Sequence, residues 1–194
     1  KTLITQKSIA VLPFKNISSD PENEYFADGM TEELINALSK INGLKVTART
    51  SSLVYKNKQV DVRHVGNNLG VSTVLEGSIR KAKDAVRITA QLIRTDNGFH
   101  IWSESFDRKL ENIFELQDEV SLLIVDKIRE NFGHIEIEEQ LVKSQTHNIE
   151  AYQYYLKGRF YQLNWKLEDF STAIEFYKQS IKLDPNYFQP FFFF

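Results

Sequence analysis

The polar residues best suited to chemistry lie in two short segments, 15–18 and 49–52. Each follows an apolar run that predicts a strand, and open α/β sheets bind their ligands at the carboxyl ends of parallel strands. Two cations, an amide and several hydroxyl groups suit an anionic or sugar-like ligand. The candidate ligand-binding residues are Lys15, Asn16, Ser18, Arg49, Thr50, Ser51 and Ser52.

A structural role is the alternative for the same residues. Arg49 can pair with an acid such as Glu76 or Asp28, and the serines can form turns. The two alternatives differ in whether Arg49 faces a ligand or a carboxylate of the protein.

Catalytic and metal-binding patterns are missing from the sequence. There is no cysteine, which excludes thiolate nucleophiles and cysteine-ligated metals. There is also no glycine-rich phosphate loop, no Gly-x-Ser-x-Gly elbow and no His-Glu-x-x-His motif. Four histidines without ligand spacing fall on different predicted elements: His64, His100, His134 and His147. We therefore expect no catalytic residue, no metal and no cofactor.

Three carboxylates, Asp28, Glu32 and Glu33, lie close together in the sequence. The apolar stripe of a helix begins at Met30, so these acids fall at its predicted start. Capping and the helix dipole explain all three there without catalysis.

The elements that must position these residues follow from apolar periodicity. Continuous runs and alternation predict strands over 8–14, 44–48, 73–81, 85–94 and 99–106, and helices over 30–41, 62–69 and 113–132. A strand–helix–strand start implies a parallel crossover, and Asn97-Gly98 marks a hairpin in an antiparallel meander. The prediction is an α/β (α+β) domain with a mixed sheet and the order β-α-β-α-β-β-β-α.

Residues 150–187 instead predict an all-α helical hairpin. Residues 173–185 resemble the second helix of a tetratricopeptide repeat (TPR), with Ala173 at its small position, Tyr177 at its aromatic position and Pro185 as its terminator. Leu156 and Gly158 resemble the signature of the first helix, although the intervening turn is longer than in a standard repeat. We interpret this segment as the first repeat of an array.

One repeat alone leaves large side chains uncovered, because the next repeat normally packs against it. Such exposed apolar groups rarely persist on soluble monomers. We therefore expect the hairpin to dock on the α/β domain or to self-associate. The predicted interaction surface comprises Phe176, Tyr177 and Ile181 together with Trp102, for which core packing is the alternative.

Six ordered blocks in the first part of the chain resemble the TolB-like domain, which occurs in TolB and FlgO relatives, in bacterial regulators and in some adenylate-cyclase-like proteins. The blocks are 8–14, 20–30, 48–52, 74–78, 87–92 and 101–104, and the resemblance covers about residues 7–130. It implies a mixed α/β domain without established catalytic chemistry, placed between an output module and helical repeats.

The domain organisation follows from these two resemblances. We assign residues 7–133 to the TolB-like domain, 134–149 to an acidic linker or helix extension, and 150–187 to the TPR-like repeat. Residues 188–194 are rich in phenylalanine and fit neither unit, so we interpret them as an artefact. The chain begins with Lys1 and is expected to be a fragment of a longer protein.

Charge and hydropathy limit the partners. The net charge of −2 divides into +4 over residues 1–110 and −6 over 111–194, which is too dilute for a nucleic-acid footprint. No apolar run is long enough to span a bilayer. We expect a protein or peptide partner at the TPR region, a small anionic ligand as a second candidate, and no nucleic-acid contact or membrane span in this fragment.

The predicted function is sensing or protein interaction, without catalysis, within a bacterial signalling or transcription-regulatory protein whose output domain lies outside this fragment. Two alternatives remain: the regulatory region of an adenylate-cyclase-like enzyme, and an envelope scaffold similar to TolB or FlgO. The expected location is the cytoplasm, and the periplasm or membrane would follow from a leader or anchor before Lys1.

Overall fold

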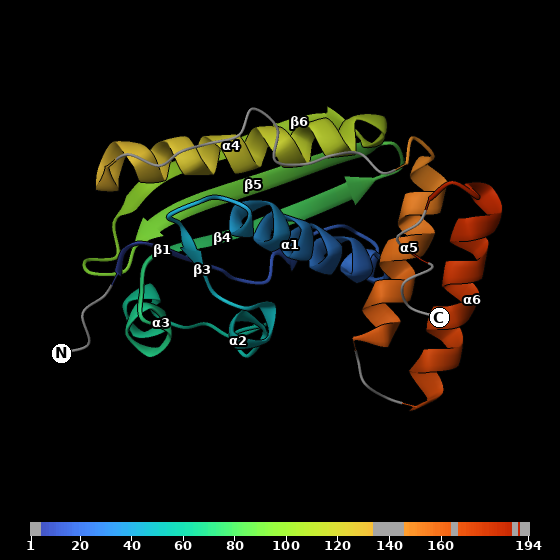
Figure 1. Ribbon diagram of the computed structural model, residues 1–194, viewed down its shortest axis with the longest axis horizontal. Coiled ribbons are helices and arrows are strands. Elements are labelled where there is room, and N and C mark those ends of the chain that lie inside the picture. Colours follow the sequence, from blue (N-terminus) through green and yellow to red (C-terminus); the bar gives the residue numbers. More distant parts are fainter. Residues whose placement is uncertain (1–4, 134–145, 164–166, 188–189, 191–194) are drawn as a thin grey trace.

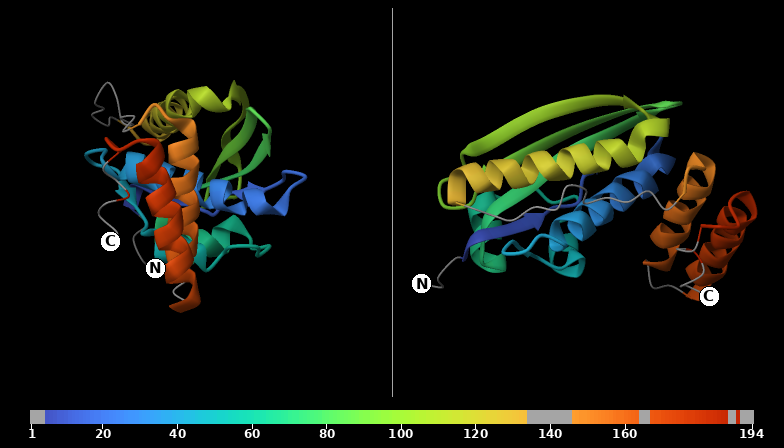
Figure 2. Two further views of the ribbon diagram at one scale, coloured as in Figure 1. Left: turned by 90° about the vertical axis from the view of Figure 1, so that its right-hand side faces the viewer. Right: turned by 45° about the horizontal axis from the view of Figure 1, so that its top comes forward.

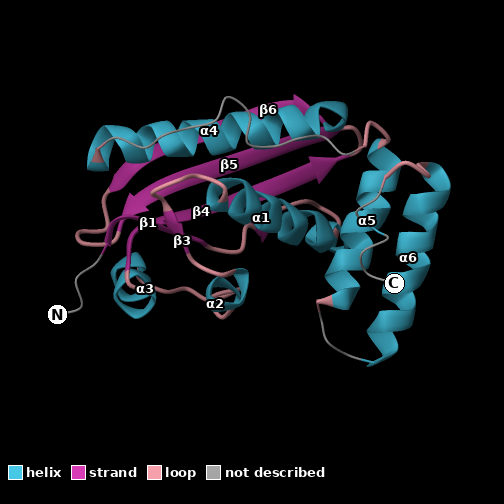
Figure 3. Ribbon diagram, viewed as in Figure 1, coloured by secondary structure: helices cyan, strands magenta, loops and turns pink. Residues whose placement is uncertain are grey.

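A six-stranded mixed sheet forms the centre of the larger part of the protein in the computed structural model (Figures 1 and 3). The structure describes residues 5–133, 146–163, 167–187 and 190. Its strands are β1 (Thr5–Val11), β2 (Lys15–Asn16), β3 (Lys45–Val46), β4 (Val71–Ala82), β5 (Ala85–Arg94) and β6 (His100–Lys109). Its helices are η1 (Pro21–Asn23), α1 (Glu24–Ser39), α2 (Arg49–Leu53), α3 (Val62–Leu69), η2 (Leu110–Asn112), α4 (Ile113–Phe132), α5 (Ile149–Gln162) and α6 (Leu167–Leu183).

The strand order is β3-β1-β4-β5-β6, with β2 pairing to β4 off this path. Strand β1 runs parallel to both β3 and β4, whereas β4, β5 and β6 form an antiparallel meander. The predicted mixed sheet is therefore present. The observed order adds β2 and α2 to the predicted one, because the chain breaks its first strand at Leu12-Pro13-Phe14 and coils into a short helix at Arg49.

Helices α1 and α4 cover one face of the sheet, and α3 covers part of the other (Figures 1 and 2). The apolar stripe of α1 is fully buried at Met30, Leu34 and Leu38. It meets the side of β4 that carries Leu75 and Ile79. A smaller cluster beneath α3 contains Ala10, Val65, Val71 and Val74. The main core therefore lies between the sheet and the α1–α4 layer.

Helix α1 begins earlier than its apolar stripe predicts. Asp20 accepts a hydrogen bond from the backbone N–H of Glu22, and Pro21 is the first residue of η1, which leads directly into α1 at Glu24. Proline suits a first helical position because its missing N–H would be unbonded there. The prediction that Asp28 caps the helix was therefore wrong, since Asp28 lies a full turn inside it.

Helices α5 and α6 pack against each other at one end of the sheet, beside the amino-terminal half of α1 (Figure 2). Gly158 and Ala173 allow their close approach, since a Cβ atom on Gly158 would lie 2.4 Å from the ring of Tyr177. On the other side of α5, Leu156 packs over Gly29 of α1. The hairpin is thus docked on the α/β unit through α5.

Most of the predicted linker 134–149 and of the phenylalanine-rich tail 188–194 falls outside the described residues. The hydroxyl of Thr146 donates to Asp184 just after α6 (2.5 Å), and Asn148 caps α5. Over the described part of the chain, none of the helices combines the length and apolarity needed to cross a membrane.

Candidate functional site

A pocket of about 220 Å³ lies beyond the carboxyl end of β1, next to the predicted Lys15. We call it the β1-end pocket; its polar lining comes from Lys15, Tyr55, Lys58, Glu76, Thr89 and Gln91. It occupies the part of the sheet face that α3 leaves open. Beyond Val74, the residues of β4 on this face change from apolar to polar, and Glu76 and Ser78 pair across to Gln91 and Thr89 of β5.

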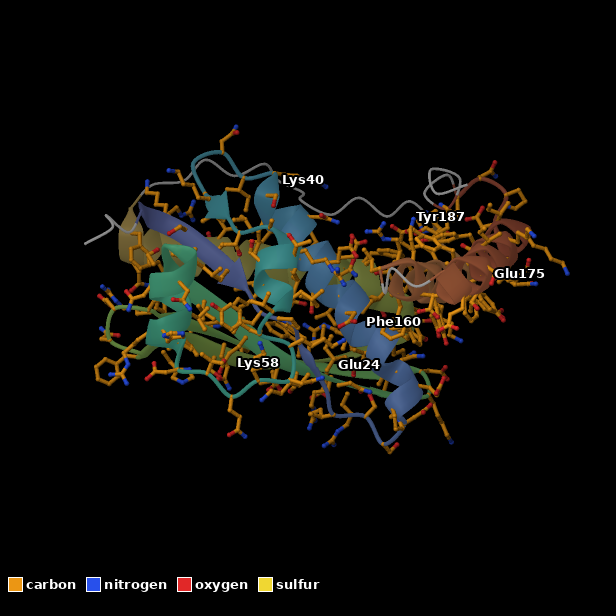
Figure 4. The ribbon with its side chains drawn as sticks, turned by 90° about the horizontal axis from the view of Figure 1, so that it is seen from below. Glu24, Lys40, Lys58, Phe160, Glu175 and Tyr187 are labelled. Atoms are coloured by element: carbon orange, nitrogen blue, oxygen red, sulfur yellow. The ribbon has the colours of Figure 1, made fainter. Side chains whose placement is uncertain are left out.

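The charged groups of the β1-end pocket are available to a ligand. Among the residues that the structure describes, the side chains of Lys15, Lys58 and Glu76 make neither a hydrogen bond nor an ion pair. Lys58 projects from the loop after α2 (Figure 4). Two cations, one carboxylate and neighbouring amide and hydroxyl groups suit a small polar molecule that carries an anionic group.

The other predicted residues of the first segment have local partners. The side chain of Asn16 accepts from the backbone N–H of Ser18 (2.9 Å) and donates to the carbonyl of Asp20 (3.2 Å). The hydroxyl of Ser18 accepts from the backbone N–H of Lys81 (2.9 Å). Asn16 and Ser18 therefore fix the turn after β2, and Lys15 alone of the predicted set lines the pocket.

The second predicted segment forms helix α2 instead of an open loop. Ser52 is buried and its hydroxyl lies 3.1 Å from that of Thr47, while Thr50 and Ser51 face solvent. The Nε atom of Arg49 lies 3.9 Å from Oε2 of Glu32 on α1. Arg49 thus faces a carboxylate of the protein, as the structural alternative expected, although the acid is Glu32 and neither Glu76 nor Asp28.

A cluster of charged residues joins α1 to the segment after α2. The ammonium of Lys56 lies 2.7 Å from both carboxylate oxygens of Asp28 and 2.9 Å from Oε1 of Glu24. Burial raises the pKa of Asp28, and the hydrogen bond from Lys56 opposes that shift. Asp28 and Glu24 share one cation, so Lys56 neutralises both acids and links α1 to the segment after α2.

A second ionic contact joins α1 to α5. The guanidinium of Arg159 donates to Glu32, which also faces Arg49. The neighbouring Glu33 is half-buried, and burial followed by repulsion from Glu32 raises its pKa to about 7, which Arg159 and Lys40 partly oppose. The carboxylates of Asp28 and Glu32 therefore pair with cations from the α2–α3 segment and from α5.

The uncharged contacts of the docked hairpin surround these ion pairs. The ring of Tyr152 packs 4.7 Å from that of Phe114 on α4, and its buried hydroxyl accepts from Nε2 of Gln117 (2.8 Å). The side-chain oxygen of Gln153 accepts from Lys81 of β4 (2.9 Å) and lies 3.2 Å from the hydroxyl of Tyr25. The interface is mixed, because the apolar contacts of Tyr152 and Leu156 lie among several polar ones.

The predicted interaction surface is divided by the structure. Tyr177 is buried between α5 and α6, because its ring fills the space that Gly158 leaves, so it is not a surface residue. Phe176 is half-buried and stacks on Tyr161, and Ile181 is half-buried as well. Trp102 is half-buried on β6, where its indole N–H donates to Glu104 (3.0 Å).

Metal-ligating clusters are not found within the described residues. His64 lies on α3, where its Nε2 is 2.9 Å from the amide nitrogen of Asn68. His100 is exposed at the start of β6, and His147 precedes α5. The last of the four, His134, lies outside the described residues.

Sequence reasoning missed the cations that complete the charged cluster. Lys56 and Arg159 lie far from Asp28 and Glu32 in the sequence, and no spacing rule connects them. One signal was available, since four acids between Glu24 and Glu33 exceed what one helix start needs. Such an excess on one helix calls for cations from elsewhere in the chain.

The mixed sheet with helices on both faces and the docked helical hairpin define the class of the protein as a mixed α/β domain with an appended helical hairpin. Residues 5–123 match the family model described as HilA/YgeH-like transcriptional regulator, second domain. The chain belongs to this family. The coarse prediction of a domain from a regulatory protein is thereby confirmed.

A curated relative extends the similarity across the hairpin. The chain is 43% identical over 183 residues to a protein named putative adenylate cyclase 3 from Rhizobium meliloti (strain 1021). The match covers 94% of this chain and 31% of the relative. The chain thus corresponds to less than one third of that protein.

Solved structures with a similar chain course include three bacterial proteins. TolB from Acinetobacter baumannii gives a TM-score of 0.49 at 17% identity, over 63% of this chain and 28% of that one. Lipoprotein GNA1162 from Neisseria meningitidis gives 0.45 at 19% identity, over 64% and 95%. The C-terminal domain of LpoB from Escherichia coli gives 0.42 at 21% identity, over 56% and 87%.

Proposed function

We propose that this chain is a non-catalytic regulatory module of a bacterial signalling or transcription-regulatory protein, in which the hairpin docks on and releases from the α/β domain. The observation that carries the proposal is the composition of the docking interface. It combines the Arg159–Glu32 ion pair and hydrogen bonds from Gln117 and Lys81 with the apolar contacts of Leu156 and Tyr152. Polar interfaces between units of one chain allow relative motion, whereas large apolar ones do not.

The hairpin is proposed to be the first TPR-like repeat and to bind a protein or peptide partner. The close contact of Gly158 with Tyr177, the burial of Ala173 and the position of Pro185 after α6 support this assignment. Phe176 and Ile181 remain partly exposed on α6. A partner that packs there competes with, or adds to, the docked arrangement.

Two outputs are proposed for the longer protein. Control of transcription is the leading one, supported by the family of the α/β domain. Control of cyclic-AMP synthesis is the second, supported by the 43% identity that includes the hairpin. The TolB-like resemblance of the α/β domain is compatible with both, and a cytoplasmic location is proposed for either.

The test uses the full-length protein with the hairpin forced away from α1. Leu156→Asp places a charge against Gly29, and Lys182→Asp adds the same charge at an exposed position of α6. We expect Leu156→Asp to change reporter transcription or cyclic-AMP production at least about threefold, and Lys182→Asp to leave both unchanged. Equal outputs from both variants and the parent, with Leu156→Asp shown to be undocked by hydrogen exchange, would refute the proposal.

A further inference from the structure

A second cavity, of about 350 Å³, lies where the hairpin meets the α/β unit. We call it the junction cavity; the residues that matter here are Tyr25, Lys81, Gln153, Lys157, Tyr161 and Phe176. Phe160 and Glu24, which also line it, lie next to each other where α5 meets α1 (Figure 4). A molecule bound in this cavity contacts the α/β unit and the hairpin at once, and its volume is within the range of small-molecule sites.

Lys157 of α5 places an ammonium group over aromatic rings instead of beside a carboxylate. Its Nζ atom lies 5.3, 5.5 and 5.7 Å from the ring centroids of Tyr25, Tyr154 and Phe176. Cation–π contacts of this kind hold the charge without satisfying the N–H donors. Within the described part of the chain, this side chain has no hydrogen bond and no ion pair.

Lys81 brings a second ammonium group from the end of β4. It donates to Gln153 (2.9 Å) and to the hydroxyl of Tyr25 (3.2 Å), and no carboxylate of the described residues lies within 4.0 Å of it. Burial and then the charge of Lys157 lower the pKa of Lys81, while Asp20 opposes this shift. Two half-buried cations therefore face one cavity, and neither forms an ion pair within the described residues.

The walls and the mouth of the junction cavity restrict what a counter-ion can be. Tyr161 and Phe176 stack with ring centroids 5.5 Å apart, and both rings line the cavity. Asp20 and Glu22 line the cavity from exposed positions. Their negative charges offset those of Lys81 and Lys157, so the cavity has no large net positive charge to hold a dianion. The cavity suits one negative charge on a flat apolar body.

We propose that the junction cavity binds a small aromatic carboxylate, with its carboxylate between Lys81 and Lys157 and its ring against Tyr161 and Phe176. The ligand pairs with both cations and connects β4 to α5. It therefore strengthens docking of the hairpin. This regulatory consequence rests on the function proposed above, whereas the binding itself does not.

Benzoate is the probe, followed by NMR titration with the 194-residue chain. We expect benzoate to bind, and benzamide and benzylamine, which share its ring, to bind at least about tenfold more weakly because they lack the negative charge. Inorganic phosphate should bind more weakly than benzoate. Lys157→Met should weaken benzoate binding about tenfold or more, and Lys178→Met, on an exposed lysine of α6, should leave it unchanged.

Lys157→Met is the decisive variant. Lys81 is less suitable for this test, because it also donates to Gln153 and its substitution would weaken the interface directly. The proposed site is wrong if benzoate does not bind, or if it binds no better than benzamide. It is also wrong if benzoate binds equally to Lys157→Met and Lys178→Met. If phosphate binds as tightly as benzoate, the inference that the ligand is aromatic is wrong. The output test with Leu156→Asp is independent, so either proposal can fail alone.

Discussion

At the scale of single residues, Lys56 has the clearest energetic role. Its side chain is 22% exposed, and it neutralises Asp28, which is 11% exposed, as well as Glu24. Removing one partner of a buried ion pair leaves the other charge uncompensated. Because the acids here are only partly buried, the penalty is smaller than for a fully enclosed pair.

We expect Lys56→Met to lower the free energy of unfolding by about 1–3 kcal/mol. Lys58→Met is the matched control, since Lys58 lies two residues further on, is exposed and has no ion pair among the described residues. Thermal or urea unfolding of both variants measures the difference. If the two variants have the same free energy of unfolding, Lys56 does not stabilise the fold through these carboxylates.

Glu33 makes the docked state sensitive to pH. Its pKa of about 7 in the folded protein lies above the ordinary value of 4.5. A raised carboxyl pKa means that the folded state binds the proton more tightly, so this contribution is complete below pH 4.5 and is lost as the pH rises through 7. The groups that face it are Glu32, Lys40 and Arg159, with Tyr152 and Tyr155 from α5.

We expect Glu33→Gln to be more stable than the parent at pH 8, by roughly 1–3 kcal/mol, and close to it at pH 5. Asp28, whose pKa is also raised, keeps some pH dependence in both proteins. Glu130→Gln on the exposed side of α4 is the control. Unfolding curves at both pH values measure this difference in stability. If the difference between Glu33→Gln and the parent is the same at pH 5 and pH 8, the prediction is wrong.

At the scale of elements, Gly158 determines how closely α5 and α6 approach. Alanine is a better helix former than glycine by about 1 kcal/mol, so Gly158→Ala would stabilise an unconstrained helix. Here its Cβ atom would lie 2.4 Å from the ring of Tyr177, and the ring or the helix must move. We expect a net loss of stability, with faster hydrogen exchange in α6 and little change in β4 and β5.

Gln179→Ala is the control for this prediction, because it improves helix propensity at an exposed position of α6. It should slow exchange in α6 slightly. A Gly158→Ala protein with slower exchange than the parent would show that the two helices are not closely packed at this point.

Most elements could be predicted from local signals. Helix α3 has the predicted bounds, because Asp61 caps its start and Gly70, at φ 67°, ends it. Strand β5 also has its predicted bounds, since its alternation is clean and turns flank it. The start of α1 could not be predicted from its stripe, because the cap at Asp20 acts on η1 before the apolar residues begin.

The candidate sites were less predictable than the elements. Lys15 lies at the β1-end pocket because a strand end is a local property. Lys58 lines this pocket only because of the path of the chain after α2, and Glu76 only because β4 pairs with β1. Likewise, Lys81 and Lys157 meet only because α5 docks at the end of β4, and no sequence spacing records that contact.

At the scale of the whole molecule, Tyr152 is a buried aromatic contact between the hairpin and the α/β unit. It is 1% exposed, packs on Phe114, and accepts the hydrogen bond from Gln117. Tyr152 belongs to the hairpin, and both partners belong to α4. Its removal therefore weakens the interface at the edge of the buried cluster that also contains Met30 of α1.

We expect Tyr152→Ala to cost about 3–5 kcal/mol of docking free energy, the usual price of truncating a buried aromatic side chain. Since that is comparable to the stability of a small interface, we expect one unfolding transition in the parent and two in Tyr152→Ala, with α5 and α6 losing hydrogen-exchange protection first. Tyr152→Phe keeps the ring and removes only the acceptor for Gln117, so it should cost about 1–2 kcal/mol and preserve a single transition. A single transition in Tyr152→Ala, with α5 still protected, would mean that the ionic contacts of Arg159 and Glu32 suffice to hold the hairpin, and the docking would then depend on charge instead of on this ring.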